Sequence, residues 1–201
     1  MGRLLGKRIA FGVTGSHCSL EEVLVQVHRL RDEGALVIPV FSYSVQTTTT
    51  RFGTPEHWRE AFTQASGHAP LTEIAEVEPF GPQRLVDAMV ISPCTGNTLA
   101  KLAAGITDTP VLMAAKAVLR NGGPLVLAIS TNDALGNNAR HLGLLMNAKH
   151  IYFVPFGQDN PEEKPNSLVA AWELLVDTLV AAFAGCQLQP VLIQRAKRAV
   201  R

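Results

Sequence analysis

The sequence predicts an α/β domain built on an open parallel sheet with helices on both faces. Short runs of β-branched and apolar residues alternate with longer stretches of helical periodicity, which is typical of βαβ units. Hydrophobic residues make up 47% of the 201 residues and charged residues 17%, which is enough apolar surface for one substantial core. We therefore expect one domain over residues 1–185, followed by a C-terminal tail over 186–201.

Each predicted strand comes from a short apolar run. The runs cover residues 8–13, 35–41, 88–92, 124–130 and 150–156. Between the first two, apolar residues recur at the spacing of one helix face, Ser19 and Glu22 are spaced as a capping box, and Gly34 is placed to end the helix. Further helices are predicted at 98–104, 110–120, about 134–147 and 166–184.

The stretch from 47 to 82 is less regular and is expected to form a lid or insertion. We expect a short helix after Pro55 and a short strand near Leu71. The segment "GQDNPEEKPN", residues 157–166, is predicted to be a surface loop after the last main strand, and the basic segment 194–201 is predicted to fray.

Composition and charge exclude several classes of partner. With 18 basic against 17 acidic side chains, the chain lacks a field suited to nucleic acid or an anionic membrane, so we expect a small ligand. The most apolar of the later stretches carries Glu173 and Asp177, which argues against a membrane span. Cys18, Cys94 and Cys186 lack the spacing of a zinc site or a disulfide framework, which fits a reducing cytoplasm.

Small polar residues follow the predicted strands at their carboxyl ends, where open parallel sheets bind ligands. After the first strand, Gly12 and Gly15 allow a tight turn whose amides near Ser16 are placed for a phosphate, although an empty turn explains them equally. After the second, Ser42 is expected to contact ligand, while the threonines at 47–50 indicate a solvated loop. No acidic residue stands there to hold an adenosine ribose, so these hydroxyls suit a single phosphate or a ribityl chain.

The loop after the third strand carries the strongest signal. Pro93 is expected to end the strand, and Thr95, Gly96, Asn97 and Thr98 follow just before a helix. Their amides and hydroxyls can cap that helix and converge on an anion. Capping explains one such residue but hardly four in a row, so an anion site is the better hypothesis.

The loop after the fourth strand is again polar. Ser130, Thr131 and Asn132 are placed either to meet the hydrogen-bonding edge of a planar ring or to cap the next helix. Asp133 suits a helix N-terminus in both cases, because an anion is favoured there. The sequence leaves both alternatives open.

Four segments together resemble a known family of flavoproteins. "VTGS" at 13–16, "FS" at 41–42, "MVISPCTGNTLAKLAAGITD" at 89–108 and "PLVLAIS" at 124–130 stand in the family's order. The family is that of homo-oligomeric FMN-containing cysteine decarboxylases, which includes phosphopantothenoylcysteine decarboxylases, peptidyl-cysteine decarboxylases and flavin prenyltransferases. The resemblance implies a single-domain three-layer α/β/α Rossmann-like (flavodoxin-like) fold, FMN at the strand ends, and homo-oligomers that are trimers or dodecamers.

The resemblance also implies which residues form the site. The expected FMN-binding residues are Gly15, Ser16, Ser42, Thr95, Gly96, Asn97, Thr98, Ser130 and Thr131. A catalytic histidine precedes the third strand in the decarboxylases, and His68 is the nearest candidate for a general base, with His57 and His17 as alternatives. Cys94 indicates a packed thiol rather than a nucleophile.

The stretch 125–161 and the overall length are most similar to one subgroup of the family. Its members are the B subunits of an oxidoreductase whose A subunit holds a nicotinamide cofactor, NAD(P), and whose substrate is a dicarboxylate. Two substrate carboxylates call for cations. The candidates are Lys101, Lys116, Arg120 and Arg140.

Two departures bear on the choice of activity. The segment "STNDALGNNA" does not reproduce the PxMNxxM segment of the decarboxylases, and the arginine that lies near this place in the prenyltransferases is absent. The oxidoreductase subunit is therefore the first hypothesis. The alternatives are a stand-alone FMN-dependent decarboxylase or prenyltransferase, and a non-catalytic scaffold subunit without flavin.

Overall fold

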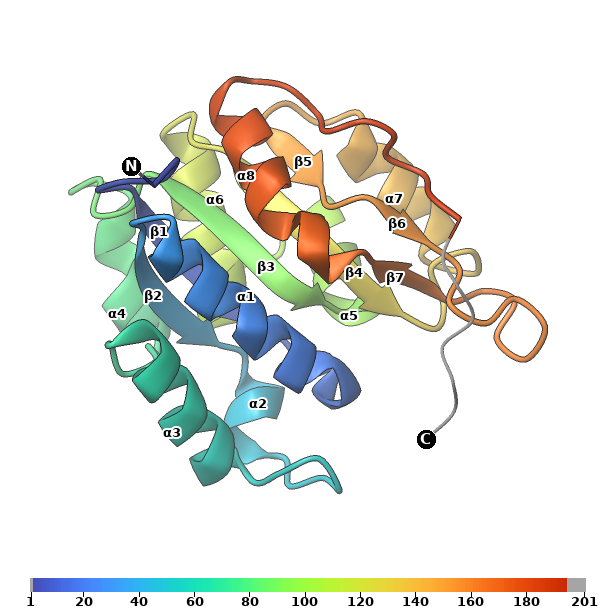
Figure 1. The fold of residues 1–201 in the computed structure, drawn as a ribbon, viewed down its shortest axis with the longest axis horizontal. Coiled ribbons are helices and arrows are strands. Elements are labelled where there is room, and N and C mark those ends of the chain that lie inside the picture. Colours follow the sequence, from blue (N-terminus) through green and yellow to red (C-terminus); the bar gives the residue numbers. More distant parts are fainter. Residues whose placement is uncertain (1, 195–201) are drawn as a thin grey trace.

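The computed structural model describes residues 2–194, and within them the chain forms a seven-stranded mixed sheet flanked by helices (Figure 1). The strands are β1 Arg8–Val13, β2 Leu36–Phe41, β3 Ala88–Cys94, β4 Leu125–Thr131, β5 Ile151–Phe153, β6 Phe156–Gly157 and β7 Leu168–Ala170. Their order is β2-β1-β3-β4-β7-β6, with β5 paired to β4 beside that path. The five strands β1 to β5 pair in parallel, as predicted.

Helices cover both faces of the sheet. They are α1 Leu20–Asp32, α2 Tyr43–Thr47, α3 Pro55–Ser66, α4 Ile74–Val77, α5 Gly96–Ala103, α6 Pro110–Arg120, α7 Ala139–Met146 and α8 Leu175–Phe183. One buried cluster joins the sheet to α1, α3 and α8, and the other joins it to α4, α5, α6 and α7. Every residue of β3 is buried, because helices cover this central strand on both sides.

The predicted helix at 166–184 is wrong in its first part. Residues Leu168–Ala170 form β7, which runs antiparallel to β4 and to β6, and α8 begins only at Leu175. A short apolar run fits a buried strand and a buried helix equally well, so periodicity did not separate them. The sheet is mixed rather than wholly parallel for this reason.

The predicted strand at 150–156 is divided into β5 and β6. Pro155 stands between them, and a proline cannot donate to a strand ladder. The second piece turns into a hairpin with β7, whose connecting loop spans 158–167. This β6–β7 hairpin is joined to the carboxyl end of β4, because Val169 of β7 pairs with Ser130 of β4.

Smaller corrections concern element ends. β3 does not end at Pro93 but runs to Cys94, and its pairing with β4 shifts register between Ile91 and Cys94, where a bulge accommodates the proline. Helix α5 begins at Gly96, and α7 begins at Ala139 after a series of turns.

The stretch from 47 to 82 is packed against the domain. Helix α3 forms after Pro55 as predicted, and Trp58 and Phe62 on it are buried in the same cluster as α1. Leu71 makes one isolated parallel bridge to Val40, so the short strand expected there is reduced to a single bridge.

The C-terminal segment that follows α8 runs along the edge of the sheet. The Gln187 side chain accepts from the Phe153 amide at 2.8 Å and donates to the Phe153 carbonyl at 2.7 Å. Residues 195–201 of the predicted fraying segment lie outside the described part of the chain. None of the helices within 2–194 is long and apolar enough to cross a membrane.

Candidate functional site

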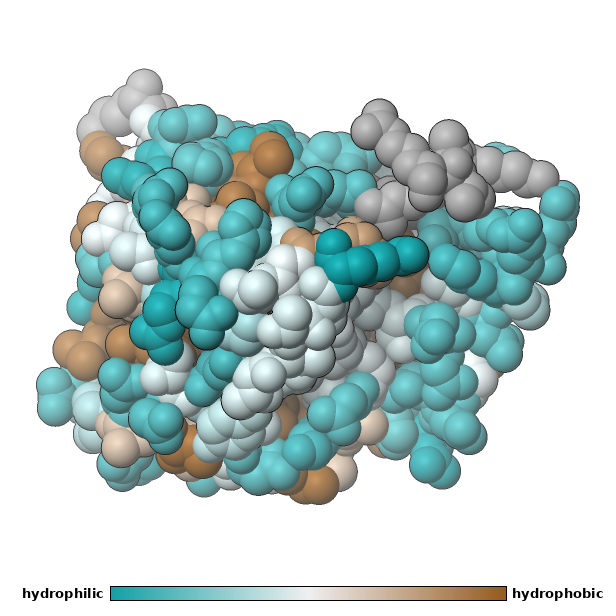
Figure 2. Space-filling model, turned by 90° about the horizontal axis from the view of Figure 1, so that it is seen from below, coloured by the Kyte–Doolittle hydropathy of each residue, from teal (hydrophilic) through white to brown (hydrophobic). Residues whose placement is uncertain are grey.

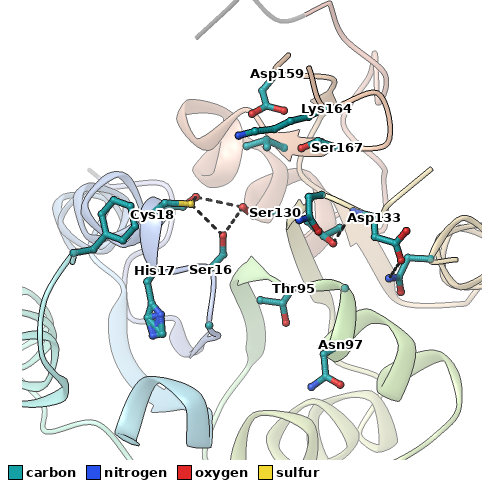
Figure 3. A pocket seen from close by; sticks show the side chains of 18 of the residues that line it. Ser16, His17, Cys18, Thr95, Asn97, Ser130, Asp133, Asp159, Lys164 and Ser167 are labelled. Carbon is teal, nitrogen blue, oxygen red and sulfur yellow. Dashed lines mark hydrogen bonds between the residues drawn. The ribbon is translucent and has the colours of Figure 1, made fainter. Parts of the chain in front are cut away.

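A cavity of about 760 Å³ lies where the carboxyl ends of β1, β3 and β4 meet (Figure 3). Its volume is in the range of small-molecule sites, roughly 300–1,000 Å³. Seven of the nine predicted FMN-binding residues line it: Gly15, Ser16, Thr95, Gly96, Asn97, Ser130 and Thr131. In the view from below Figure 1, residues of intermediate hydropathy fill the middle of the face, and hydrophilic residues with some hydrophobic ones lie around them (Figure 2).

A cluster of hydroxyls joins the first loop to the end of β4. The Ser130 Oγ lies 2.8 Å from the Ser16 Oγ and 3.3 Å from the Ser19 Oγ (Figure 3). Cys18 adds a thiol 3.8 Å from the Ser16 Oγ. Ser19 was expected to cap α1 through its side chain; it makes no such bond, because its hydroxyl faces Ser130 instead.

Thr14 ties the first loop to the third. Its hydroxyl donates to the Pro93 carbonyl at 2.6 Å and accepts from the Thr95 amide at 3.1 Å. The side chain is fully buried, so these bonds are shielded from water. Sequence reasoning did not single out Thr14, although it stands inside the "VTGS" segment beside Gly15.

The start of α5 offers backbone amides to the cavity. The Thr95 hydroxyl is the N-cap and accepts from the Thr98 amide at 3.4 Å. The Gly96 and Asn97 amides precede the first intrahelical bond, so they stay available to a ligand. A Cβ on Gly96 would lie 2.7 Å from both the Thr131 Oγ1 and the Asn138 Nδ2, so any larger residue here would force these side chains to shift. The Asn97 side chain is exposed on the cavity.

The loop after β4 is held by Asp133. Its carboxylate accepts from the Asn137 amide and from the Asn138 side-chain amide, each at 3.2 Å. Its own amide donates to the Thr131 hydroxyl at 3.3 Å. The capping alternative is wrong, because α7 begins at Ala139 with Asn138 as its N-cap. Thr131 and Asp133 instead build the turns before α7, and the Ser130 hydroxyl joins the cluster with Ser16 and Ser19. Contact of this loop with the edge of a ring stays a prediction.

His17 lines the cavity beside Ser16, and the ring is largely buried. The Nε2 atom is buried without a hydrogen-bond partner among the described residues. Burial lowers the pKa of the His17 imidazole below its usual value, because desolvation disfavours the charged form. The ring is therefore neutral at pH 7.

The β6–β7 hairpin forms a wall of the cavity that the sequence did not predict. Asp159, Lys164, Ser167 and Val169 line it from this side. Asp159 is a buried residue, 8% exposed, and its Oδ1 has no hydrogen-bond partner within the described chain. Residues 157–166 were expected to be only a surface loop. They reach the site because β7, where the sequence predicts helix, pairs with β4 beside the cavity.

Other predicted residues lie outside the cavity lining. Thr98 is buried behind Thr95, and Ser42 is buried with its Oγ 3.1 Å from the Ser44 Oγ, so neither lines the cavity. His68 is exposed after α3, where its Nδ1 lies 3.3 Å from the Ser66 carbonyl.

The four candidate cations do not line the cavity. Lys101 pairs with Asp108 at 2.6 Å, and Lys116, Arg120 and Arg140 likewise do not line the cavity. Cys94 is a fully buried thiol, as expected, and burial raises its pKa to about 12.

Comparison with known proteins assigns the family. The sequence model described as Flavoprotein matches residues 2–184. The chain belongs to the flavoprotein family. This flavoprotein is 50% identical over 194 residues to the B subunit of dipicolinate synthase from Bacillus subtilis (strain 168), covering 96% of this chain and 97% of the relative.

Solved structures confirm the predicted fold class. The crystal structure of the dipicolinate synthase B subunit from Bacillus halodurans C matches this flavoprotein with a TM-score of 0.89 and 51% identity, covering 98% of this chain and 100% of that one. A dodecameric FMN-dependent UbiX-like decarboxylase from Escherichia coli O157:H7 matches with a TM-score of 0.61 and 26% identity, covering 74% and 79%.

Proposed function

We propose that this flavoprotein binds FMN in the cavity and acts as the B subunit of a dipicolinate synthase. In this role it oxidises a dihydrodipicolinate-level dicarboxylate to dipicolinate, together with an A subunit that holds NAD(P), in the cytoplasm of the sporulating mother cell. One observation carries the proposal: hydroxyls and free amides of three strand-end loops converge on one cavity. The 50% identity to the Bacillus subtilis relative supports the choice of reaction.

The residues fit a mononucleotide phosphate without a cation. The Gly96 and Asn97 amides at the start of α5 favour an anion, since a helix N-terminus carries partial positive charge. Ser16 adds a hydroxyl and the neighbouring turn adds amides. No acidic residue stands in these two loops, so a phosphate dianion meets no repulsion there.

The remaining lining suits a planar ring with a substrate above it. FMN, when bound, supplies a ring that accepts a hydride as the substrate becomes aromatic. Ser130 and Ser16 present hydroxyls in the middle of the cavity, where they can donate to or accept from the edge of such a ring. The β6–β7 hairpin bounds the cavity on a further side.

We also propose that the flavoprotein forms a homo-oligomer, a trimer or a dodecamer. Ile106, Leu135, Leu144 and Met146 are exposed although all are large and apolar. Leu144 and Met146 are in α7, Leu135 precedes α7, and Ile106 follows α5. Helices α5 and α7 contact each other. Exposed apolar side chains gathered in one region are typical of subunit contacts, and the Escherichia coli relative is dodecameric.

The test of the cofactor is a visible absorption titration of the purified protein with FMN. We expect saturable binding with a shifted flavin spectrum. Asn97→Asp is expected to weaken affinity by about tenfold or more, because it places a negative charge beside the phosphate. The matched control is Asn147→Asp, an exposed position at the end of α7 that does not line the cavity.

The test of the reaction is an assay of dihydrodipicolinate oxidation with and without the A subunit. We expect oxidation with both subunits and FMN present. Activity of this chain alone on an acyl-cysteine or a prenyl phosphate would favour a stand-alone decarboxylase or prenyltransferase. A protein that stays colourless with FMN would favour a scaffold subunit.

A further inference from the structure

We propose that Lys164 is the residue that recognises the substrate, by binding one of its carboxylates from the β6–β7 hairpin. This inference rests on the proposed function for the identity of the substrate, a small dicarboxylate. It adds a specificity residue to a site whose other predicted contacts are neutral.

The charges of the cavity single out Lys164. Among the described residues that line the cavity it is the one lysine or arginine, whereas the cations expected from the sequence lie elsewhere. Two carboxylates in a small ligand need at least one cation, because burying an unpaired charge is costly. Lys164 is the side chain of the cavity that meets this need.

The charge of Lys164 is free to bind a ligand. Lys164 is in none of the ion pairs found within residues 2–194, although Asp159 lines the same wall. Lys101, by contrast, pairs its charge with Asp108 at 2.6 Å. An ammonium that faces a cavity without an acidic partner within 4 Å is a ready site for a carboxylate.

The backbone that carries Lys164 is fixed. The Lys164 amide donates to the Asn160 carbonyl at 2.8 Å, and the Ser167 amide donates to the Lys164 carbonyl at 3.0 Å. Gln158 spans the loop by donating to the Pro165 carbonyl at 2.7 Å. The loop is thus closed on itself, so its lysine starts from an anchored position.

The location of Lys164 separates it from the expected phosphate site. Lys164 and Ser167 come from the hairpin, while Thr95 and Asn97 come from the opposite part of the cavity, with the hydroxyls of Ser16 and Ser130 between them (Figure 3). If the phosphate of one ligand binds at the start of α5, Lys164 on the hairpin side stays available to bind a second molecule. The geometry therefore assigns Lys164 to the substrate rather than to FMN.

The test is calorimetric titration of the protein with dipicolinate, with and without saturating FMN. We expect Lys164→Met to weaken dipicolinate binding by about fivefold or more, because a charge-assisted contact is lost. Lys164→Arg should stay within about threefold of the wild type, since it keeps the cation. Lys116→Met, an exposed lysine of α6 away from the cavity, should change nothing. FMN affinity should stay within about twofold in all of these variants.

The outcomes separate the two proposals. Equal dipicolinate affinity in Lys164→Met and the wild type, or no dipicolinate binding by the wild type, overturns the role of Lys164. A loss of FMN affinity in Lys164→Met also overturns it, because the lysine would then hold the phosphate. A wild type that binds no FMN overturns the proposed function, and the flavin-free titration then still decides the role of Lys164.

Discussion

Thr14 is a buried hydroxyl that fixes two loops of the site relative to each other. It bonds both to the Pro93 carbonyl and to the Thr95 amide, which leads into the cap of α5. Any ligand that needs the first and third loops at once depends on this link. Thr14 therefore supports the site without lining it.

Replacing Thr14 by valine is expected to lower both stability and FMN affinity. The change leaves the buried Pro93 carbonyl and the half-buried Thr95 amide without their partner, at a cost of about 1–3 kcal/mol in the free energy of unfolding. The control is Thr178→Val in α8, which removes a buried hydroxyl bonded to the Leu174 carbonyl and does not touch the cavity lining. Denaturant unfolding and FMN titration should show a stability loss in both variants and an affinity loss only in Thr14→Val. Equal FMN affinity in the two would contradict this role.

His17 makes stability depend on pH near neutrality. Burial lowers its folded-state pKa, so the unfolded chain takes up a proton more readily than the folded one as the pH falls. The stabilising contribution of the neutral ring is present above the unfolded pKa, about 6.5, and is lost below it. We expect His17→Gln to lose less stability than the wild type between pH 7 and pH 5, as measured by denaturant unfolding. The same pH dependence in both proteins would contradict the burial of a neutral His17.

Residues at the site were predictable where they stand directly after a strand. Ser16, Gly96 and Asn97 follow strand ends, and parallel strands bring their carboxyl ends to one edge of the sheet. Thr14 and Ser42 stand at the same edge, but the sequence does not say which way a side chain points where a strand ends. For this reason Ser42 was expected in the cavity, and Thr14 was overlooked.

At the scale of elements, α3 is part of the core rather than a loose lid. Phe62 on α3 meets Phe41 of β2 edge to face, with ring centroids 5.4 Å apart. Trp58, one helix turn earlier, is also buried. The helix was predicted from its start after Pro55, but its packing was not, because the surrounding sequence is irregular.

Phe62→Ala is expected to destabilise the protein by about 3–5 kcal/mol, since it removes a fully buried aromatic ring and leaves a cavity. The comparison variant is His68→Ala, an exposed position two residues beyond the end of α3, which should change stability little. Denaturant unfolding measures both. A similar small effect in Phe62→Ala would show that α3 is a detachable lid after all.

The β6–β7 hairpin shows where prediction from sequence fails at this scale. Its strands are two and three residues long, too short for a periodic signal, and they pair with residues far away in the sequence. The β-propensity of a short segment does not predict such a pairing. The pairing depends on the carboxyl end of β4, where Ser130 and Thr131 are available as partners. The loop that carries Lys164 reaches the cavity because β7 pairs with β4.

For the whole molecule, the exposed apolar residues near α7 predict assembly. Leu144 is 62% exposed, and a charge there should oppose burial in a subunit contact. We expect Leu144→Asp to form a smaller particle than the wild type in light scattering after gel filtration. Val25→Asp, at an exposed position of α1 on the other face of the sheet, should leave the particle size unchanged. If Val25→Asp alone changed the particle size, the subunit contact would lie on the α1 face of the sheet instead.

The central claim for the molecule is that the loops after β1 and β3 form a neutral cradle for a phosphate at one edge of the sheet. The most direct measurement is a crystal structure of the protein soaked with FMN. We expect the phosphate within hydrogen-bond distance of the Gly96 and Asn97 amides, with the ring extending toward Ser130. A flavin bound elsewhere on the molecule, or a cavity closed by its own side chains, would contradict the account.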